Sequence, residues 1–320
     1  MTAISVLPPV LTPEELTAYA ALRTDAVWFE SPGQWSAFRG DKAANALNGL
    51  VTNDVASLAV GDSVYAAALS PKGKMVADML IARFDDATFL IYVLPAVAAS
   101  WLALARKYVN PRLCKVTDES DHYRSFMVYG ARAVHAIDAA LEGIAARRFT
   151  APLMGSISGT MLLADAAQAE QVLHRVQSSS LTRGTPNLWN VLRVEAGRPV
   201  MGTDMDENTI PQEANLDTLG AISFSKGCYT GQETVARLHF RGHVNKHLRG
   251  LRSDFPLPLG AEISDATGKV VGEVRSSATS PSLGAIALAM IRREVAAGDQ
   301  TTVATGEGSI VARVVDLPFE

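Results

Sequence analysis

The sequence predicts an α+β fold of two or three domains. The chain has 320 residues, which is more than one hydrophobic core usually supports. Up to about residue 247, segments with strand-like alternation are mixed with segments of helical periodicity, and the two kinds do not alternate regularly. This favours α+β over a doubly wound parallel sheet. From residue 248 onward, short β-like runs are separated by prolines and glycines, which indicates a small barrel or sandwich.

Helices are predicted where cap signals precede apolar periodicity. Thr12 can cap a helix that starts with Pro13, and Glu15 can reach back to the cap's backbone N–H. Asp41 precedes an apolar pattern that would end near residues 52–54. Further helices are expected over 95–109, over 131–148, and over 165–177 with Asp165 as the cap.

Strands are predicted where the apolar residues alternate. Residues 63–69, 74–84 and 88–94 are separated by turn sequences, so they predict an antiparallel meander. Strands are also expected over 122–129 and 160–163. In the C-terminal region we expect them over 248–251, 262–263, 270–276, 285–290 and 310–315.

The composition excludes several classes of protein. Hydrophobic residues make up 48% and charged residues 19%, which excludes a disordered, collagenous or coiled-coil chain. A net charge of −4 excludes a general polyanion binder. Two cysteines cannot form a disulfide framework, a four-cysteine zinc site or a full iron–sulfur ligand set. No secretory signal, transit peptide or membrane span is recognisable, so we expect a cytoplasmic protein without membrane contact.

Common nucleotide and metal motifs are absent. The sequence has no phosphate loop, no G-x-G-x-x-G, no H-E-x-x-H and no C-x-x-C. Residues 204–215 differ from a calcium loop, because Thr209 and Asn215 stand where glycine and glutamate are required. These absences disfavour ATPases, simple Rossmann dehydrogenases and zinc proteases.

The most unusual segment is the octapeptide 226–233, in which two glycines flank a thiol. Lys226 could favour the thiolate of Cys228, which would make the loop reactive or ligand-facing. The alternative is a tight turn around a half-buried structural cysteine. The other members of the octapeptide are Gly227, Tyr229, Thr230, Gly231, Gln232 and Glu233.

Two other charged positions are candidates for binding or catalysis. If residues 193–195 form a strand, the side chains of Arg193 and Glu195 lie on the same face. The pair could then be a simple salt bridge. Alternatively, the Glu195 carboxylate could accept paired hydrogen bonds from a planar donor edge, such as a guanidinium or a pterin. Asp78 shares a strand face with Val76 and Leu80. It would suit proton transfer or binding of a protonated amine if that face is buried, and it would be unremarkable if the face is solvated.

The stretch 237–252 is basic, with Arg237, Arg241 and Lys246 among its cations. It also contains three histidines spaced by four, but no carboxylate or thiol accompanies them, so we predict no metal site. A cationic surface for phosphates, nucleic acid or a carboxylate tail is favoured, with a plain solvated face as the alternative.

Taken together, these segments identify a family resemblance. The octapeptide matches the K-G-C-[YF]-x-G-Q-E signature of the YgfZ-type folate-binding proteins, a branch of the superfamily of the glycine-cleavage aminomethyltransferase (GcvT, T-protein). Residues 40–55 resemble the superfamily's opening helix, and 70–78 resemble its strand hairpin. Residues 193–197 with 210–213 resemble its central pterin-side segment, and 260–290 resemble its barrel.

The resemblance implies a GcvT/YgfZ-like architecture of three domains arranged as a ring around a tetrahydrofolate cleft. Two α/β domains are expected, a folate-binding α+β region over 1–120 and 180–247 and an intervening ferredoxin-like region over 121–179. A small β-barrel over 248–320 completes the chain.

The resemblance also implies roles for individual residues. Catalytic roles fall to Cys228, Asp78 and Lys226. The ligand, tetrahydrofolate or a one-carbon derivative, would be held by Glu195, Arg193, Gly227, Tyr229, Gly231, Gln232 and Glu233, with Arg241 near the anionic tail. Asp78 matches one of two adjacent acidic positions in the aminomethyltransferases. Ala77 stands at the other, and this departure disfavours transferase chemistry.

The family role is support for the assembly or repair of iron–sulfur enzymes, with a linked effect on tRNA modification. The expected partners are therefore folate, iron–sulfur client or assembly proteins, and tRNA through the basic stretch 237–252. One chain cannot supply four thiolates, so contact with a cluster would be transient or shared with a partner. The alternatives are a folate-dependent one-carbon transferase or demethylase, and an RNA-binding module.

Overall fold

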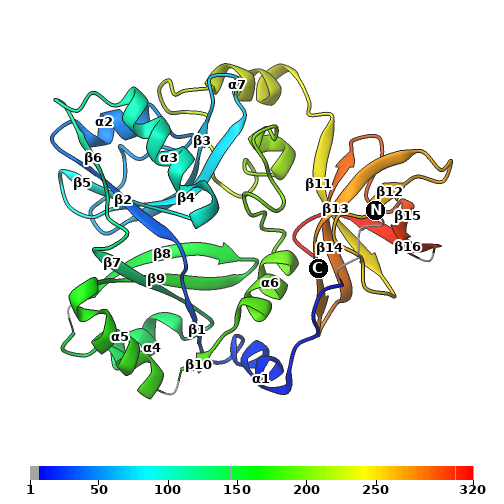
Figure 1. Cartoon of the computed structure of the whole chain (residues 1–320), viewed down its shortest axis with the longest axis horizontal. Coiled ribbons are helices and arrows are strands. Elements are labelled where there is room, and N and C mark those ends of the chain that lie inside the picture. The colour runs from blue at the N-terminus through cyan, green and yellow to red at the C-terminus, as the bar shows by residue number, and fades with distance from the viewer. Residues whose placement is uncertain (1–6, 145, 180, 307, 320) are drawn as a thin grey trace.

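The computed structural model describes residues 7–144, 146–179, 181–306 and 308–319. These residues form two five-stranded sheets and a closed six-stranded barrel. In Figure 1 the two sheets lie one above the other, the barrel lies beside them, and helix α6 (Pro186–Glu195) stands between. The predicted α+β class with a C-terminal barrel is confirmed.

The first sheet is antiparallel, with the strand order β3-β4-β5-β2-β6. Helices α2 (Ala43–Asn48) and α3 (Pro95–Tyr108) cover one of its faces around a core that includes Phe38 and Trp101. The predicted meander and the helix that follows it are confirmed. The strands are β2 (Gln34–Arg39), β3 (Ser63–Leu69), β4 (Met75–Arg83), β5 (Thr88–Val93) and β6 (Lys115–Asp118).

The second sheet has the order β10-β1-β7-β9-β8, in which only the β1–β10 pair is parallel. Helices α4 (Ala133–Ala140) and α5 (Ala166–Ser178) cover its outer face. The strands are β1 (Val27–Glu30), β7 (Tyr123–Tyr129), β8 (Arg147–Met154), β9 (Ile157–Asp165) and β10 (Thr182–Arg183).

The helix predicted over 131–148 is wrong in its second half. Helix α4 ends at Ala140, and Gly143 follows in the left-handed region at φ 78°, a conformation that commonly ends helices. The chain then turns into β8, where Phe149 and Ala151 alternate with exposed residues. Asp165 does occupy the N-cap position of α5, but its side chain makes no capping hydrogen bond. Asp41 is displaced as the cap of α2 by Lys42.

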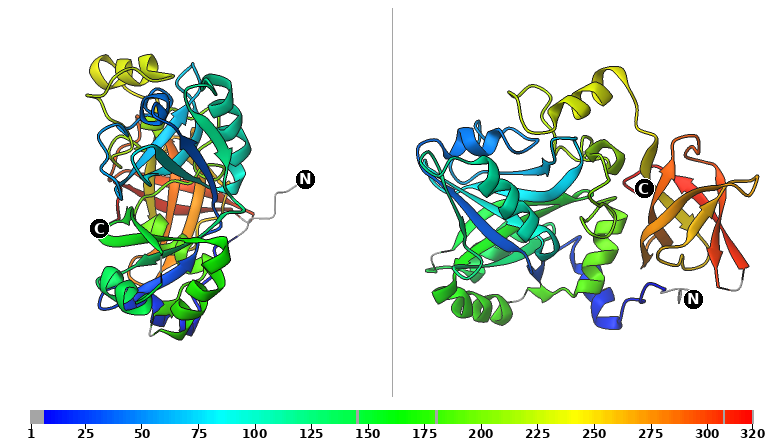
Figure 2. Two further views of the ribbon diagram at one scale, coloured as in Figure 1. Left: turned by 90° about the vertical axis from the view of Figure 1, so that its left-hand side faces the viewer. Right: turned by 45° about the horizontal axis from the view of Figure 1, so that its top comes forward.

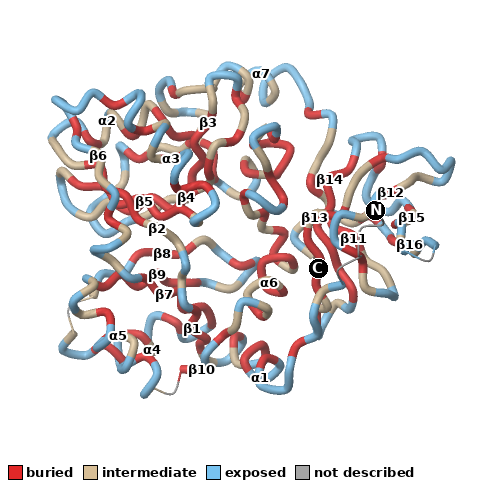
Figure 3. Tube along the Cα trace, in the orientation of Figure 1, coloured by how far each residue is buried: buried red, intermediate tan, exposed pale blue. Residues whose placement is uncertain are grey.

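The inner faces of the two sheets share one hydrophobic core. It includes Trp35 and Leu80 from the first sheet and Met161 from the second. The indole N–H of Trp35 donates to Ser125 Oγ across the layers at 3.1 Å. Between β1 and β2 the chain passes from one sheet to the other in three residues, 31–33. Figure 3 shows the buried strands stacked between exposed outer segments.

The barrel closes in the order β11-β14-β13-β12-β15-β16, because β11 pairs antiparallel with β16. Strand β15 is not predicted by the sequence because Gln300, Thr301 and Thr302 hide its alternation. The remaining predicted strands are confirmed. The bounds are β11 (Lys246–Ser253), β12 (Glu262–Ser264), β13 (Val270–Ser280), β14 (Gly284–Arg292), β15 (Gln300–Thr305) and β16 (Gly308–Val315).

The remaining helices connect these bodies. Helix α1 (Pro13–Ala21) has the predicted capping box, with Thr12 N–H donating to Glu15 Oε2 at 2.8 Å. A 3₁₀ turn η1 (Pro211–Ala214) and helix α7 (Gln232–Arg241) precede the barrel, and Figure 2 shows α7 at the outer edge of the molecule. Within the described parts of the chain, no helix is both long enough and apolar enough to cross a bilayer.

Candidate functional site

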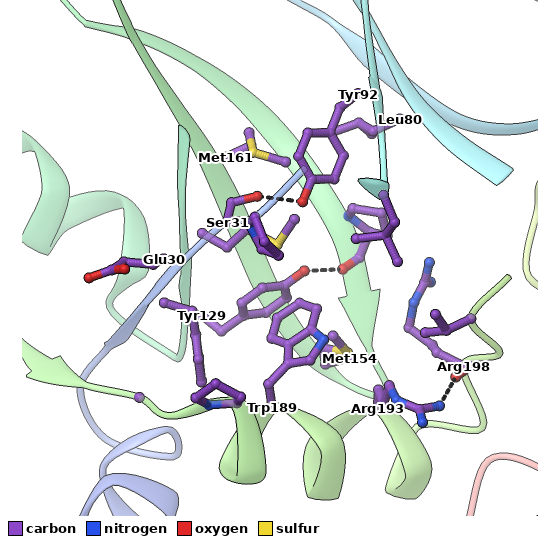
Figure 4. A pocket seen from close by; sticks show the side chains of 18 of the residues that line it. Glu30, Ser31, Leu80, Tyr92, Tyr129, Met154, Met161, Trp189, Arg193 and Arg198 are labelled. Atoms are coloured by element: carbon purple, nitrogen blue, oxygen red, sulfur yellow. Dashed lines mark hydrogen bonds between the residues drawn. The ribbon is translucent and has the colours of Figure 1, made fainter. Parts of the chain in front are cut away.

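A cavity of about 430 Å³ lies between the two sheets and reaches helix α6. Ligand pockets in proteins typically measure about 300–1,000 Å³, so the volume suits a small organic molecule. Figure 4 shows lining side chains from both sheets and from α6 around this space, whereas Glu30, at its edge, points away from it. The cavity therefore lies where the shared core of the two sheets ends.

Aromatic rings form much of the cavity wall. Trp189 projects from α6 and meets Phe29 and Tyr129 edge to face, at centroid distances of 5.3 and 5.5 Å. The hydroxyl of Tyr129 donates to the carbonyl of Pro152 at 2.8 Å, and that of Tyr92 accepts from Ser31. Because these hydroxyls have partners, the rings are fixed in place. They offer flat apolar surfaces to a planar ligand.

Asp78 places a carboxylate against this apolar space. Its Oδ2 accepts a hydrogen bond from the hydroxyl of Tyr65 at 2.9 Å, while Oδ1 is buried and has no hydrogen-bond partner among the described residues. Burial raises the pKa of Asp78, against the lowering effects of Tyr65 and of nearby Arg198. The backbone N–H groups of Asp78 and Met201 lie near the carboxylate and also lower its pKa, but neither makes a hydrogen bond of ordinary geometry to Oδ1, so this oxygen can accept one from a ligand.

The residues around Asp78 keep this acceptor available. Burial and the Asp78 charge raise the pKa of Tyr65 well above its usual range, so the phenol stays protonated and acts as the donor. The guanidinium of Arg198 lies over the Tyr65 ring, 4.7 Å from its centroid, and also lines the cavity. Asp78 is half-buried, as expected for a face shared with buried Leu80.

Arg193 also lines the cavity, but its charge is already paired. It donates to Asp204 Oδ2 at 2.8 Å and to Ser276 Oγ of the barrel at 2.7 Å, and both partners are buried. Arg193 therefore joins α6 to the barrel. It contributes its aliphatic stem, rather than a free cation, to the cavity.

The expected strand at 193–195 is wrong, because Thr185 caps and Pro186 starts a helix that runs to Glu195. In a helix, residues two apart point about 200° apart, so Arg193 and Glu195 do not share a face. Glu195 accepts from the hydroxyl of Tyr19 at 2.9 Å and from Ser280 Oγ at 2.5 Å. The cavity wall, as far as the described residues go, does not include Glu195.

The octapeptide forms a separate cluster with two other segments of the resemblance. Lys226 Nζ donates to the backbone carbonyls of Asn48, Val51 and Asn53 at 2.7, 2.8 and 2.7 Å. Burial lowers the pKa of Lys226 to about 8. Since its ammonium is committed to these carbonyls, Lys226 holds the loop against the end of α2. Cys228 is exposed on the same loop.

Two glycines allow the octapeptide to approach the hairpin turn between β3 and β4. Gly231 has φ 83°, and a Cβ there would lie 2.6 Å from the carbonyl oxygen of Ser70. A Cβ on Gly73 would lie 2.6 Å from Thr234. Tyr229 is buried in the core of the first sheet, whereas Gly227 is exposed. Gln232 and Glu233 form the first turn of α7, and none of the octapeptide lines the cavity as described.

The basic stretch does not form one face. Helix α7 ends at Arg241 and β11 begins at Lys246, so the three histidines fall on a helix, a linker and a strand. His239 stacks on Phe224 at a centroid distance of 3.6 Å, and Arg241 is exposed away from the described cavity wall. No cluster of three or more His, Cys, Asp or Glu suited to a metal ion occurs among the described residues. A role of this stretch in tRNA binding stays a prediction.

Comparisons with known proteins agree with this fold. The family model described as the GCVT N-terminal domain matches residues 20–166, and the glycine cleavage T-protein C-terminal barrel domain matches residues 246–319. The crystal structure of the glycine cleavage system aminomethyltransferase T from Bartonella henselae superposes with a TM-score of 0.85, at 20% identity, over 98% of this chain and 91% of that chain. The chain therefore belongs to the GcvT-like superfamily.

Sequence relatives place the chain more narrowly. The tRNA-modifying protein YgfZ of Cronobacter sakazakii is 30% identical over 72% of this chain and 72% of its own length. The protein of the same name from Escherichia coli O127:H6 is 34% identical over 66% and 67%. An aminomethyltransferase from Acidobacterium capsulatum is 26% identical over 88% and 81%. The chain is a YgfZ-type member of the superfamily.

Proposed function

We propose that the protein binds tetrahydrofolate, or a one-carbon derivative of it, in the cavity between the sheets. The observation that carries the proposal is the buried Oδ1 of Asp78, which has no partner among the described residues and adjoins aromatic walls. A pterin is planar and presents an amino group beside a ring N–H, which suits a carboxylate acceptor between aromatic rings. Bound tetrahydrofolate would supply a carrier for one-carbon units.

Calorimetric titration with tetrahydrofolate tests the assignment. Asp78→Asn should weaken binding, whereas Asp86→Asn, at a side chain that is 97% exposed, should not. Glu195→Ala is the informative third variant, because the sequence assigns the pterin to Glu195. If Glu195→Ala weakens binding and Asp78→Asn does not, the pterin lies at Glu195 and the proposed cavity site is wrong.

We further propose that the protein acts in the cytoplasm as an accessory factor for iron–sulfur enzymes, with a linked effect on tRNA modification. Cys228 is the reactive or transiently ligating group in this proposal. Its exposure, on a loop that Lys226 fixes, supports access by a partner protein. The name shared by the YgfZ relatives supports the link to tRNA modification.

Complementation of a deletion strain tests the role of the thiol. Cys228→Ala should fail to restore iron–sulfur enzyme activity. Cys114→Ala, at a buried thiol in the core of the first sheet, is the matched control for loss of a cysteine. Full restoration by Cys228→Ala would refute this part of the proposal.

A folate-dependent one-carbon transferase or demethylase is the second candidate. The position of Asp78 favours it, because the acidic residue that this chain retains faces the cavity, whereas Ala77 is buried in the opposite core. The aminomethyltransferase relative points the same way. Turnover of an aminomethyl or N-methyl donor that depends on tetrahydrofolate, and that is lost in Asp78→Asn, would establish this activity.

A further inference from the structure

A cation lies beside the buried carboxylate on the cavity wall. Arg198 follows the end of α6, and both Arg198 and Asp78 line the cavity. The two side chains meet the same ring, because Arg198 Cζ lies 4.7 Å from the centroid of Tyr65 and the Tyr65 hydroxyl donates to Asp78 Oδ2 at 2.9 Å. This part of the wall therefore offers a hydrogen-bond donor next to a hydrogen-bond acceptor.

The guanidinium of Arg198 is not neutralised by a carboxylate. Within the part of the chain that the structure describes, Arg198 forms no ion pair. It donates from Nη1 to the carbonyl of Leu153 at 3.3 Å, which is long for a hydrogen bond between nitrogen and oxygen. Arg193, the other arginine near the end of α6, is paired with Asp204 at 2.8 Å. Arg198 is therefore the better suited of the two to bind a ligand.

The backbone of Arg198 is held in place. Its N–H donates to the carbonyl of Arg193 at 2.8 Å, and its own carbonyl accepts from Arg193 Nη1 at 3.3 Å. Figure 4 shows this second bond at the edge of the lining residues. Pro199 follows and restricts the chain further. Because the backbone is fixed and the side chain rests on the Tyr65 ring, a ligand would find this donor already in position.

The edge of a pterin ring has a pattern that matches this arrangement. Its 2-amino group, its N3–H and its 4-oxo group follow one another along one edge, so two donors stand next to one acceptor. A carboxylate can accept from the two donors, and the buried Oδ1 of Asp78 has no hydrogen-bond partner among the described residues. The neighbouring 4-oxo oxygen then needs a donor, which a guanidinium beside the carboxylate supplies.

We propose that Arg198 donates a hydrogen bond to the 4-oxo group of a pterin held by Asp78, and that it thereby determines which pteridines the cavity accepts. This inference rests on the proposed folate function. In a 2,4-diaminopteridine an amino group replaces the 4-oxo group and N3 carries no hydrogen, so two donors would face each other at Arg198. The cavity should therefore select 4-oxo pterins against 4-amino analogues.

Calorimetric titration of the full-length protein with two probes tests the proposal. Tetrahydrofolate and tetrahydroaminopterin differ only in the 4-oxo or 4-amino form of the ring, and they are compared at a pH where the diamino ring is not protonated. The wild type should bind tetrahydrofolate more tightly. Arg198→Met should weaken tetrahydrofolate binding about 10- to 100-fold more than it weakens binding of the analogue, the range of a hydrogen bond with a charged partner.

Two further variants refine this test. Arg198→Lys keeps a charged donor and should retain part of the preference for tetrahydrofolate. Arg23→Met is the matched control, because Arg23 also lies over a tyrosine ring, 5.0 Å from the centroid of Tyr19, but is not part of the cavity wall as described. It should leave the affinity for both probes unchanged.

Three outcomes would overturn the role of Arg198. The wild type binds both probes equally, or Arg198→Met weakens both equally, as it would if it acted only through the charge of Asp78. In the third, Arg198→Met weakens tetrahydrofolate but not 6-methyltetrahydropterin, which has the same ring without the glutamate tail, so Arg198 holds the tail. In these cases the wild type still binds tetrahydrofolate and the proposed function stands. If the wild type binds none of the three probes, the proposed function and the role of Arg198 fail together.

Discussion

Replacing Asp78 by asparagine tests two effects of the buried carboxylate separately. One is its cost to the stability of the ligand-free protein, and the other is its contribution to ligand binding. In the ligand-free protein Oδ1 is buried without a hydrogen bond from any residue that the structure describes, while Oδ2 accepts from Tyr65. Asparagine has nearly the same shape, keeps an oxygen for Tyr65 and carries no charge, although its amide nitrogen then takes the buried position of Oδ1. The expected gain therefore comes from removing a buried charge, which costs about 1.4 kcal/mol for each unit by which burial raises the pKa. We expect Asp78→Asn to raise the free energy of unfolding by about 1 kcal/mol, or about 2 °C in Tm for a chain of this size.

The gain in stability should depend on pH with a defined sign. Burial raises the pKa of Asp78 in the folded protein. The folded state therefore holds this proton more tightly than the unfolded chain does, and stability is lost as the pH rises through the folded pKa. The advantage of asparagine should be small at about pH 4, near the usual aspartate pKa, and should grow as the pH rises through the raised pKa of the folded protein. Scanning calorimetry of the ligand-free variants measures this.

Binding should change in the opposite direction. A hydrogen bond to a charged group is worth about 1.5–3 kcal/mol, so Asp78→Asn should weaken tetrahydrofolate binding about 10- to 100-fold. A variant that is more stable and yet binds more weakly is the expected signature of an acceptor kept for a ligand. If Asp78→Asn changes neither Tm nor affinity, or changes them no more than Asp86→Asn does, the reasoning is refuted.

Three further predictions concern the octapeptide cluster. Gly231→Ala should lower the free energy of unfolding in urea by about 2 kcal/mol or more, because backbone strain and the contact with the Ser70 carbonyl add together. Gly268→Ala is the control, because Gly268 has a similar φ of 82° but open space around it, and it should lose only about 1 kcal/mol. Equal losses in the two variants would contradict the close approach. A thiol reagent should label Cys228 rapidly in the native protein and Cys114 only after unfolding, since Cys114 is buried; rapid labelling of both would be inconsistent with that burial. Because the pKa of Lys226 is lowered in the folded protein, the unfolded chain keeps this proton to higher pH. The wild type should therefore gain stability relative to Lys226→Met between about pH 8 and 10. A constant difference in thermal unfolding across this window would contradict the assignment.

Local patterns predict the parts of the site that a single element determines. Asp78 is recognisable because the alternation of β4 fixes its face without reference to the rest of the fold. The octapeptide is recognisable by its glycines, and the structure shows that Gly231 is needed for the close approach to Ser70. Thr185 and Pro186 carry the same helix-start signal as Thr12 and Pro13, so the strand predicted at 193–195 could have been avoided from the sequence.

The cavity itself could not be predicted from the sequence. Tyr92, Tyr129 and Trp189 come from β5, β7 and α6, and each one looks like an ordinary core aromatic within its own segment. They converge only because the two sheets pack face to face, and that arrangement depends on tertiary contacts that no local period encodes. The separation of Glu195 from the cavity has the same origin, since Tyr19 and Ser280, its partners, are far away in the sequence.

The link between β1 and β2 limits how a ligand can enter and leave. Only residues 31–33 join the two sheets there, and a Cβ on Gly33 would lie 1.9 Å from the ring of Tyr92, on the cavity wall. So short a tether holds the sheets at a fixed spacing at this edge, and ligand exchange by separation of the sheets would require breaking their common core. Exchange should instead proceed through motion of a rim side chain such as that of Arg198, which makes the dissociation rate constant sensitive to this residue and insensitive to mutations in the outer helices.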